Sequence, residues 1–456
     1  NGSRLASSVA GVPLTANATV LSGVTSAFRP TLTKVTTLSN GMRVASENLE
    51  GETATVGIWI DAGSRYEDES NNGTAHFLEH MAFKTDLELE VENMGGHLNA
   101  YTSREQTAYF AKVFKKDIPK AVDILSDILQ NSTLDERNIE RERDVILREQ
   151  EEVEKQMEEV VFDHLHATAF QGSALGRTIL GTERNIRTIS KRDLQNYIRF
   201  NYTGPRMVLA AAGGVDHDEL VKLAERAFAG LPAGPSVWRP EPASYTGSEV
   251  RMRDDTMSHA HMVISVQGAS WTSPDYFPLL VAQAIVGSWN RGLAGGHNLG
   301  SKLAQVVAKN DLAQSFTSFN TSYSDTGLFG IYMVSDHVYD LDDLAYEVQQ
   351  EWVRICLNAT EGEVARAKAQ LKASLLLSLD GTTHICEDIG RQLLTYGKRY
   401  SWQDIHRMVD AVDAATVRRV ASEYLYDRDP AVVALGPIGS FPDYNRIRAA
   451  TLWLRN

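Results

Sequence analysis

A stretch rich in proline and glycine, residues 231–250, divides the chain, and the same order of expected strands and helices occurs on both sides of it. Proline and glycine interrupt helices and strands, which makes this stretch the clearest linker. The interrupting residues are Pro232, Gly234, Pro235, Pro240, Pro242 and Gly247. A chain of 456 residues is also too long for one ordinary hydrophobic core. We therefore predict a duplicated unit of about 210 residues, with residues 1–232 as the N-terminal half, 233–248 as the linker and 249–456 as the C-terminal half.

The repeat rests on apolar patterns that are typical of strands and helices. In the first half they predict a helix that begins near residue 75 and strands over residues 53–61, 97–102, 106–113 and 206–213. In the second half they predict a helix over residues 274–286 and strands over residues 261–267, 315–322, 327–334 and 431–435. Helices and strands in this order favour the α+β class. We expect two homologous α/β-sandwich halves that face each other across a cavity.

The composition argues against several classes of protein. A formal charge of −14 argues against nucleic-acid binding and suits a cationic ligand. No apolar run approaches the roughly 18 residues of a membrane-spanning helix, so we expect no such segment. The two cysteines, Cys356 and Cys386, are too few for a disulfide framework. The first 28 residues contain no Asp or Glu, which suits either the remnant of an organelle-targeting segment or a flexible arm.

Residues 76–80, His-Phe-Leu-Glu-His, carry the strongest chemical signal in the chain. We expect Thr74 to cap a helix on which His76 and His80, four residues apart, project from one face. Glu79 lies beside them on that helix. Two imidazoles one turn apart can bind one Zn²⁺, and a neighbouring carboxylate can take a proton from water bound to it. The order H-x-x-E-H is the inverse of the H-E-x-x-H order found in zinc metalloproteases. The alternative is a surface helix that carries two histidines and an acid by coincidence.

The second half has no such motif at the corresponding place. There the sequence over residues 279–283 is Leu-Leu-Val-Ala-Gln, which is almost entirely apolar. We therefore expect one half to carry the chemistry and the other to keep only the shape.

A catalytic zinc ion needs a third protein ligand and an open position. Residues 135–170 read as one long charged helix, and the candidate ligands on it are Glu140, Glu142, Glu149, Glu151 and Glu152. Glu142 and Glu149 are two turns apart and share one face of that helix. For most of these acids, we expect an ordinary solvated surface.

Three stretches resemble the pitrilysin/insulinase family of metallopeptidases. They are HFLEHMAF (residues 76–83), GGHLNAYTSRE (95–105) and RERDVILRE (141–149), and the resemblance continues from about Leu38 to the C-terminus, including residues 367–372 and 387–392. The resemblance implies that one Zn²⁺ per chain is held by His76, His80 and Glu149, with Glu79 as the general base. It also implies that Glu142 is an outer carboxylate that orients a ligand histidine.

Within that family, the chain is similar to the branch that removes mitochondrial presequences, and its ending over residues 442–445 and 453–455 resembles plant and algal members. The resemblance implies a heterodimer with a homologous α subunit, basic presequence peptides as substrates, and a location on the matrix side of the mitochondrial inner membrane. In plant members this subunit is also a core subunit of the cytochrome bc1 complex (respiratory complex III), so we expect other subunits of that complex as partners. The alternative is a catalytically silent structural core subunit.

The resemblance also implies a substrate-binding surface. Glu159 and Asp163, one helical turn apart on the helix that continues from Glu149, would bind the arginine two residues before the cleaved bond. Residues 97–102 would form an edge strand whose Asn99 and Ala100 contact the peptide backbone. Phe83 would contact the side chain after the cut. Tyr323, in the second half, is a candidate donor to the oxyanion of the transition state.

The spacing after Phe83 departs from that of the family. Thr85, Asp86 and Leu87 follow Lys84 directly, which leaves the chain about seven residues short of the family pattern before the acidic helix. A loop that the protein has but the structure does not resolve explains this most simply, since a true deletion would strain the wall of the site. We therefore expect an interruption of the chain between Lys84 and Asp86.

Overall fold

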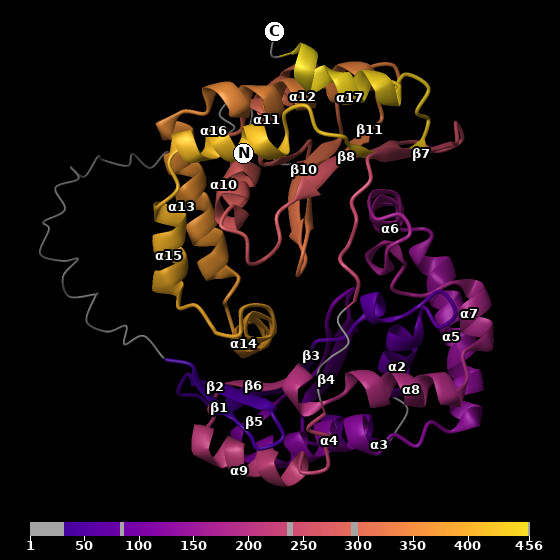
Figure 1. Cartoon of the computed structure of the whole chain (residues 1–456), viewed down its shortest axis with the longest axis vertical. Helices are drawn as coiled ribbons and strands as arrows, with labels where there is room; N and C mark the ends of the chain where they lie inside the picture. Colours follow the sequence, from indigo (N-terminus) through magenta and orange to yellow (C-terminus); the bar gives the residue numbers. More distant parts are fainter. Residues whose placement is uncertain (1–31, 83–85, 235–239, 293–299, 455–456) are drawn as a thin grey trace, which may run out of the picture. The chain divides into compact units, whose positions relative to one another are not determined.

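The computed structural model describes residues 32–82, 86–234, 240–292 and 300–454, and residues 33–456 belong to one unit (Figure 1). Two six-stranded sheets organise this unit, and one lies on each side of the linker in the sequence.

The first sheet has the strand order β1-β2-β6-β3-β5-β4. Its strands are β1 (Lys34–Thr37), β2 (Arg43–Asn48), β3 (Thr53–Ile60), β4 (His97–Thr102), β5 (Thr107–Phe114) and β6 (Met207–Gly213). β2 and β6 are parallel, and the other neighbours are antiparallel. β4 is therefore an edge strand, as the family resemblance implied.

The second sheet has the order β7-β12-β8-β11-β10-β9. Its strands are β7 (Ser248–Arg253), β8 (Ala260–Gly268), β9 (Ser288–Asn290), β10 (Ser315–Ser322), β11 (Gly327–Ser335) and β12 (Ala431–Gly436). β7 and β12 form its parallel pair. The order β7-β12-β8-β11-β10 thus repeats β2-β6-β3-β5-β4 with the same directions, which confirms the duplicated α+β fold.

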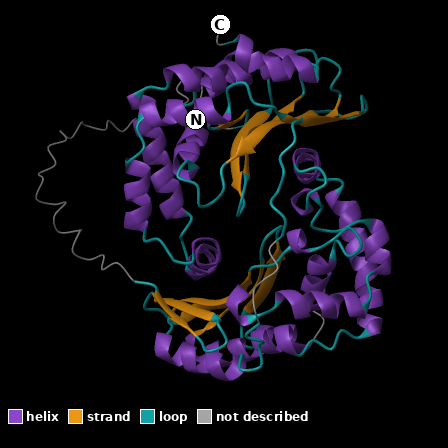
Figure 2. Ribbon diagram, viewed as in Figure 1, coloured by secondary structure: helices purple, strands orange, loops and turns teal. Residues whose placement is uncertain are grey.

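Eight α-helices of the first half are described: α2 (Thr74–Ala82), α3 (Asp86–Asn93), α4 (Ile118–Gln130), α5 (Glu136–Val153), α6 (Met157–Ala169), α7 (Glu183–Thr188), α8 (Lys191–Asn201) and α9 (His217–Ala227). The described helices of the second half are α10 (Tyr276–Val286), α11 (Lys302–Asn310), α12 (Leu341–Asn358), α13 (Glu361–Leu377), α14 (Thr382–Tyr396), α15 (Trp402–Asp410), α16 (Ala414–Tyr424) and α17 (Tyr444–Trp453). Most helices of the second half lie on one face of its sheet (Figure 2). α10 contacts α13 and α16 as α2 contacts α5 and α8.

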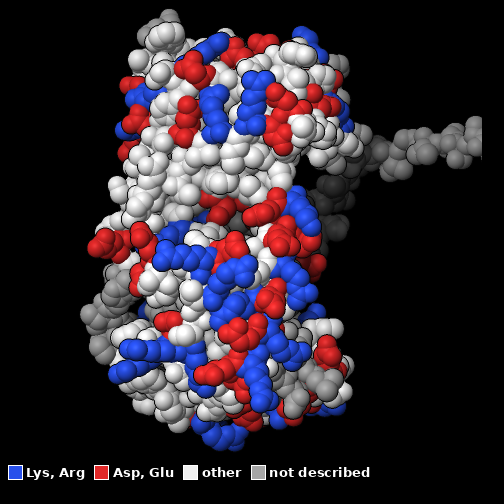
Figure 3. All heavy atoms as spheres, turned by 90° about the vertical axis from the view of Figure 1, so that its right-hand side faces the viewer, with Lys and Arg blue, Asp and Glu red and all other residues white. Residues whose placement is uncertain are grey.

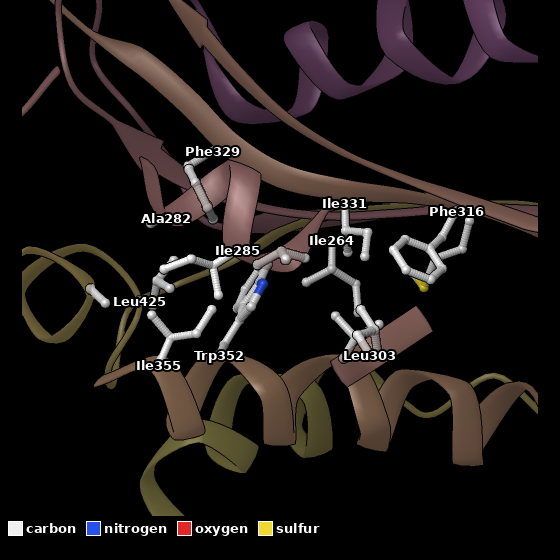
Figure 4. Packing of buried hydrophobic residues seen from close by; sticks show 14 of the residues in the cluster. Ile264, Ala282, Ile285, Leu303, Phe316, Phe329, Ile331, Trp352, Ile355 and Leu425 are labelled. Carbon is white, nitrogen blue, oxygen red and sulfur yellow. The ribbon is translucent and has the colours of Figure 1, made fainter. Parts of the chain in front are cut away.

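Each half has a main core between its sheet and its own helices. In the second half, Trp352 of α12 points toward the sheet, whose strands β8 and β11 carry Ile264 and Ile331 (Figure 4). In the first half, the alternating residues Ala54, Val56, Ile58 and Ile60 of β3 face the corresponding core. This alternation follows from the two-residue period of a strand.

The opposite face of each sheet is covered by a helix from the other half of the chain. α14 packs on β3 and β6 of the first sheet, where Trp59 is buried with Cys386, Ile389 and Leu393. α6 packs on β8 and β12 of the second sheet, where Val161 and Leu165 lie in a separate cluster. Because both faces of the sheets are buried, β6 and β12 are apolar on both faces rather than alternating. This exchange of helices ties the two halves together.

The single helix expected over residues 135–170 is wrong, because the structure ends α5 at Val153 and begins α6 at Met157. The last turn of α5 carries Glu151 and Glu152 and no basic residue, an unfavourable arrangement at the negative end of a helix dipole. Glu158 and Glu159 lie in the first turn of α6, where acids are favourable.

Some expectations fall on residues that are not described. Phe83 and the interruption expected between Lys84 and Asp86 belong to residues 83–85, which lie outside the described residues. Among the described helices, none is long and apolar enough to cross a membrane.

Candidate metal and peptidase site

The helix that carries the two histidines begins at Thr74, and its capping group differs from the expected one. The Thr74 hydroxyl donates to the carbonyl of Asn71 instead of accepting from the helix. The carboxylate of Glu67 accepts from the amides of Gly73 at 2.8 Å and Ala75 at 2.6 Å. Glu67 is buried, and burial raises the pKa of its carboxyl to about 8 against these N–H donors, which favour the charged form. Thr74 is therefore not the cap, and the buried Glu67 takes that role.

Two helices bring three metal-binding side chains together. α2 supplies His76 and His80, whose ring centroids are 4.6 Å apart, and α5 supplies Glu149. Oε2 of Glu149 lies 2.9 Å from Nε2 of His80 and 3.7 Å from Nε2 of His76. Among the described residues, these three form the one group of His, Cys, Asp or Glu side chains close enough to share a metal ion. Their ligand atoms lie within 4.8 Å of one another.

The three side chains are of the types that bind zinc, and the distances between their ligand atoms suit a zinc ion. Ligand bonds of about 2.0–2.1 Å in a tetrahedral arrangement place neighbouring ligand atoms roughly 3.4 Å apart, between the two distances to Glu149. Within the described part of the chain, Oε2 of Glu149 is buried and accepts no hydrogen bond of normal geometry. Two imidazoles and one carboxylate also leave a fourth position open, as catalytic zinc sites do.

The electrostatics of the group keep His76 neutral and Glu149 ionised, the forms that bind a metal. Burial and the neighbouring His80 ring lower the pKa of His76 to about 4, which leaves it neutral. Burial lowers the pKa of His80, but contacts with Glu149 and Glu142 outweigh this and raise it. The contact with His80 lowers the pKa of Glu149 despite burial. A cation placed among these groups therefore meets an ionised carboxylate and a neutral His76.

Glu142 lies behind His80. Its Oε2 is 3.4 Å from Nδ1 of His80, and its side chain is 3% exposed. In the tautomer that donates this Nδ1–H, the Nε2 lone pair of His80 points toward Glu149 and is free to bind a metal. The other charges of α5 are mostly exposed, and basic and acidic side chains alternate over the face that carries α5 and α7 (Figure 3). The solvated surface expected for most of these acids is correct, and Glu142 is the buried exception.

Glu79 lies between the histidines and the end of the edge strand. Burial raises the pKa of its carboxyl, while the neighbouring Thr102 of β4 and His80 oppose the increase. A carboxylate with a raised pKa beside two histidines suits proton transfer. On the same strand, Asn99 is exposed, and its side chain accepts from the amide of Ala100 at 2.9 Å.

The structure separates the two acids expected to bind arginine from the helix of Glu149. Glu159 and Asp163 lie on α6, after the interruption at residues 154–156. Glu159 is exposed, whereas Oδ1 of Asp163 is 2.7 Å from Nη2 of Arg104. Asp163 therefore has a guanidinium partner within the chain, which the sequence did not indicate.

Tyr323 is buried, and its described contacts differ from those expected of an oxyanion donor. Its hydroxyl lies 2.6 Å from Nε2 of His166, whose Nδ1 lies 2.7 Å from the carbonyl of Phe162. With Nδ1 protonated, His166 accepts the hydrogen bond of Tyr323. To stabilise an oxyanion, Tyr323 would have to give up this bond.

Sequence reasoning missed a buried arginine that connects the halves. Arg65, whose side chain is 1% exposed, contacts Glu105 at 2.6 Å and Asp325 of the second half at 2.6 Å. It also donates to the carbonyl of Glu241 in the linker. Glu105 in turn accepts from the amide and the hydroxyl of Ser324. The sequence signal available was the GGHLNAYTSRE stretch, which contains Glu105 but does not identify its partner.

Two protein-family models match consecutive parts of the chain. Residues 43–183 match the family model "Insulinase (Peptidase family M16)", and residues 188–371 match "Peptidase M16 inactive domain". The first match contains His76, Glu79, His80, Glu142 and Glu149. The second contains α10, whose sequence has no histidine or acid.

The curated relatives cover nearly the whole chain. "Mitochondrial-processing peptidase subunit beta" of Blastocladiella emersonii is 59% identical over 93% of this chain and 92% of its own length. The mouse protein of the same name is 56% identical over 93% of this chain and 88% of its own. The "Probable mitochondrial-processing peptidase subunit beta, mitochondrial" of Arabidopsis thaliana is 55% identical over 93% and 82%.

A solved structure has the same fold. A chain of "Complex III2 from Candida albicans, Inz-5 bound" superposes with a TM-score of 0.84 at 31% identity. The match covers 92% of this chain and 99% of that one.

Proposed function

The chain belongs to the insulinase family of peptidases, M16, and from that premise we propose that it is the zinc-dependent catalytic subunit of a mitochondrial presequence peptidase. The observation that carries this proposal is the approach of Glu149 on α5 to His76 and His80 on α2, beside the perturbed carboxyl of Glu79. An architectural protein would have no need of this arrangement.

In the proposed reaction, His76, His80 and Glu149 hold one zinc ion, and Glu142 fixes the ring of His80. The zinc ion would supply a Lewis acid that lowers the pKa of water and polarises the peptide carbonyl. Glu79 takes the proton from the attacking water and delivers it to the leaving amine. β4 binds the extended substrate as an added strand, with Asn99 and Ala100 at the contact, which places the backbone close to Glu79.

Substrate selection is proposed to rest on negative charge at α6. Glu159 and Asp163 would bind an arginine before the cleaved bond, with Asp163 exchanging its bond to Arg104 for one to the substrate. Phe83 would contact the residue after the cut, and Tyr323 would donate to the oxyanion after leaving His166. The proposed substrates are basic presequence peptides, and the acidic chain favours their approach.

The proposed partner is an α subunit of the same family, and the proposed location is the matrix side of the mitochondrial inner membrane. A second role, as a core subunit of respiratory complex III, is favoured by the likeness to a chain of the Candida albicans complex over nearly its full length. The two roles are compatible, because a zinc site inside the chain does not preclude assembly with other subunits. A silent core subunit remains the competing function.

The experiment that tests the proposal is cleavage of a presequence peptide by the chain assembled with its α subunit. Glu79→Gln should lower the rate constant by roughly 10²- to 10⁴-fold, the usual contribution of a general base, without loss of zinc. Glu92→Gln, at an exposed carboxylate of α3, is the matched control and should cleave normally. Cleavage by Glu79→Gln at the wild-type rate would refute the assignment of the base. A wild-type assembly that binds zinc but cleaves nothing would support the silent core subunit.

A further inference from the structure

We propose that residues 178–181 and the buried carboxylate of Glu67 form a clamp that fixes the separation of the two ligand-bearing helices, with Glu67 as a positioning residue for the metal. This inference rests on the proposed zinc site, because a fixed separation of α2 and α5 has a function only if the two helices share an ion.

In this clamp, Glu67 holds the start of α2. Glu67 accepts from the amides of Gly73 and Ala75, and from Nδ2 of Asn72 at 2.9 Å. Ala75 directly precedes His76, so the first metal ligand follows the anchored amide without an intervening residue. Together these contacts fix the position and the rotation of the first turn of α2.

The start of α2 is joined to the segment 178–181 by a close approach of two backbones. Nδ2 of Asn72 donates to the carbonyl of Thr178 at 2.9 Å. Gly73 and Gly181 both have positive φ angles, +103° and +83°. A Cβ atom on Gly73 would lie 2.9 Å from Cα of Gly181, and one on Gly181 would lie 2.6 Å from Cα of Gly73. Larger residues at these positions would force the two segments apart.

The same segment holds α5 at its metal-binding end. Nε2 of Gln150 donates to the carbonyl of Gly181 at 2.7 Å, and Gln150 is the residue directly after Glu149. Gly181 therefore contacts the start of α2 through its backbone and the end of α5 through its carbonyl. One short segment connects both sides of the metal site.

Contacts through α7 reinforce this connection. Nδ2 of Asn185 donates to the carbonyls of Glu69 and Asn72, just before α2. Arg143 of α5 donates to the carbonyls of Ile186 and Ile189 at the end of α7. None of these groups touches the metal ligands themselves. Their shared effect is to hold α2 and α5 in register.

This arrangement matters because zinc affinity depends on ligand geometry. Distances that depart by a few tenths of an ångström from the usual values mark a poor site. If the clamp is weakened, the two histidines move with α2 while Glu149 stays with α5, and the ion loses part of its coordination. In Glu67→Gln, an NH₂ group replaces one accepting oxygen and would face an amide donor, so at least one bond to α2 is lost.

The test measures the zinc dissociation constant of the full chain by competition with a chelator, alongside its melting temperature without metal. Glu67→Gln should weaken zinc binding about tenfold or more, at the lower end of the effect of groups that orient metal ligands. Asp216→Ala is the control, since Asp216 caps α9 through the amide of Glu219, alanine cannot replace that bond, and Asp216 lies on neither ligand helix. It should lower the melting temperature while the zinc dissociation constant stays unchanged.

A second variant tests the clamp in case Glu67→Gln does not fold. Gln150→Ala removes one side-chain bond from a partly exposed position and should weaken zinc binding with little change in the melting temperature without metal. The clamp is refuted if Glu67→Gln, or Gln150→Ala where the former does not fold, binds zinc as tightly as the wild type. If the wild type binds no zinc at all, it is the proposed function that fails.

Discussion

Nε2 of His80 lies 2.9 Å from Oε2 of Glu149, although the two residues belong to different helices that are far apart in the sequence. On its other side, Nδ1 of the same ring lies 3.4 Å from Oε2 of the buried Glu142. The imidazole of His80 is thus held between an inner carboxylate that can share a cation and an outer carboxylate that fixes the ring.

The outer carboxylate gives the first prediction. Glu142→Gln should weaken zinc binding roughly 10- to 100-fold, because a neutral amide no longer favours the Nδ1–H tautomer of His80. The zinc dissociation constant measured by chelator competition checks this. Excess zinc should restore most of the cleavage activity, because the ligands themselves remain. Activity that stays lost at saturating zinc would instead give Glu142 a direct part in the reaction.

The raised pKa of Glu79 predicts the acid side of the pH profile. As the general base, Glu79 must be ionised, so kcat/KM should fall as the pH decreases through the raised pKa, above the ordinary value of 4.5. Loss of zinc as its ligands are protonated would also reduce activity at low pH, but that fall should shift with zinc concentration. The profile is therefore measured at two zinc concentrations. An acid limb that moves with zinc concentration would contradict the assignment.

The ion pairs of Arg65 predict a large effect on stability. Arg65→Met should lower the free energy of unfolding by about 3–5 kcal/mol, because it leaves Glu105 and Asp325 without their shared cation where the halves meet. Arg253→Met is the control, since both side chains of its pair with Asp255 are more than half exposed and solvent screens the pair, so the variant should change the stability little. Denaturant unfolding measures both. If the two variants lower the free energy of unfolding equally, the ion pairs of Arg65 stabilise the protein no more than an exposed pair does.

For Gly390 in the exchanged helix α14, we predict that alanine destabilises the protein, which is the opposite of its usual effect in a helix. Alanine normally stabilises a helix relative to glycine by about 0.5–1 kcal/mol. A Cβ atom on Gly390 of α14 would lie 2.2 Å from the ring of Trp59, so Gly390→Ala should destabilise the protein. In Gly362→Ala of α13, the added Cβ meets nothing within 4 Å, and the variant should be neutral or stabilised. Thermal unfolding of the two variants distinguishes these outcomes, and stabilisation by Gly390→Ala would contradict the packing of α14 on the first sheet.

The sequence predicted strands β3 to β6, β8 and β10 to β12, the duplication and the helix of His76, because each depends on local patterns of apolar and polar residues. The role of Glu149 came from a family resemblance, since seven residues of spacing from Glu142 cannot distinguish a ligand from a surface acid. The partners of buried charges were beyond local patterns. Nothing near Arg65 indicates Asp325, and Glu67 could be recognised as a cap only once the loop over residues 67–73 was folded. The exchange of α6 and α14 between the sheets is likewise a property of tertiary packing.

The most direct test of the central claim is the zinc content of the purified chain, measured by elemental analysis for the wild type, Glu149→Ala and Glu152→Ala. Glu152 is an exposed acid on the same helix and serves as the control. We predict one zinc per chain for the wild type and for Glu152→Ala, and far less for Glu149→Ala. One tightly bound zinc per chain in Glu149→Ala would contradict the claim that α2 and α5 share a metal ion.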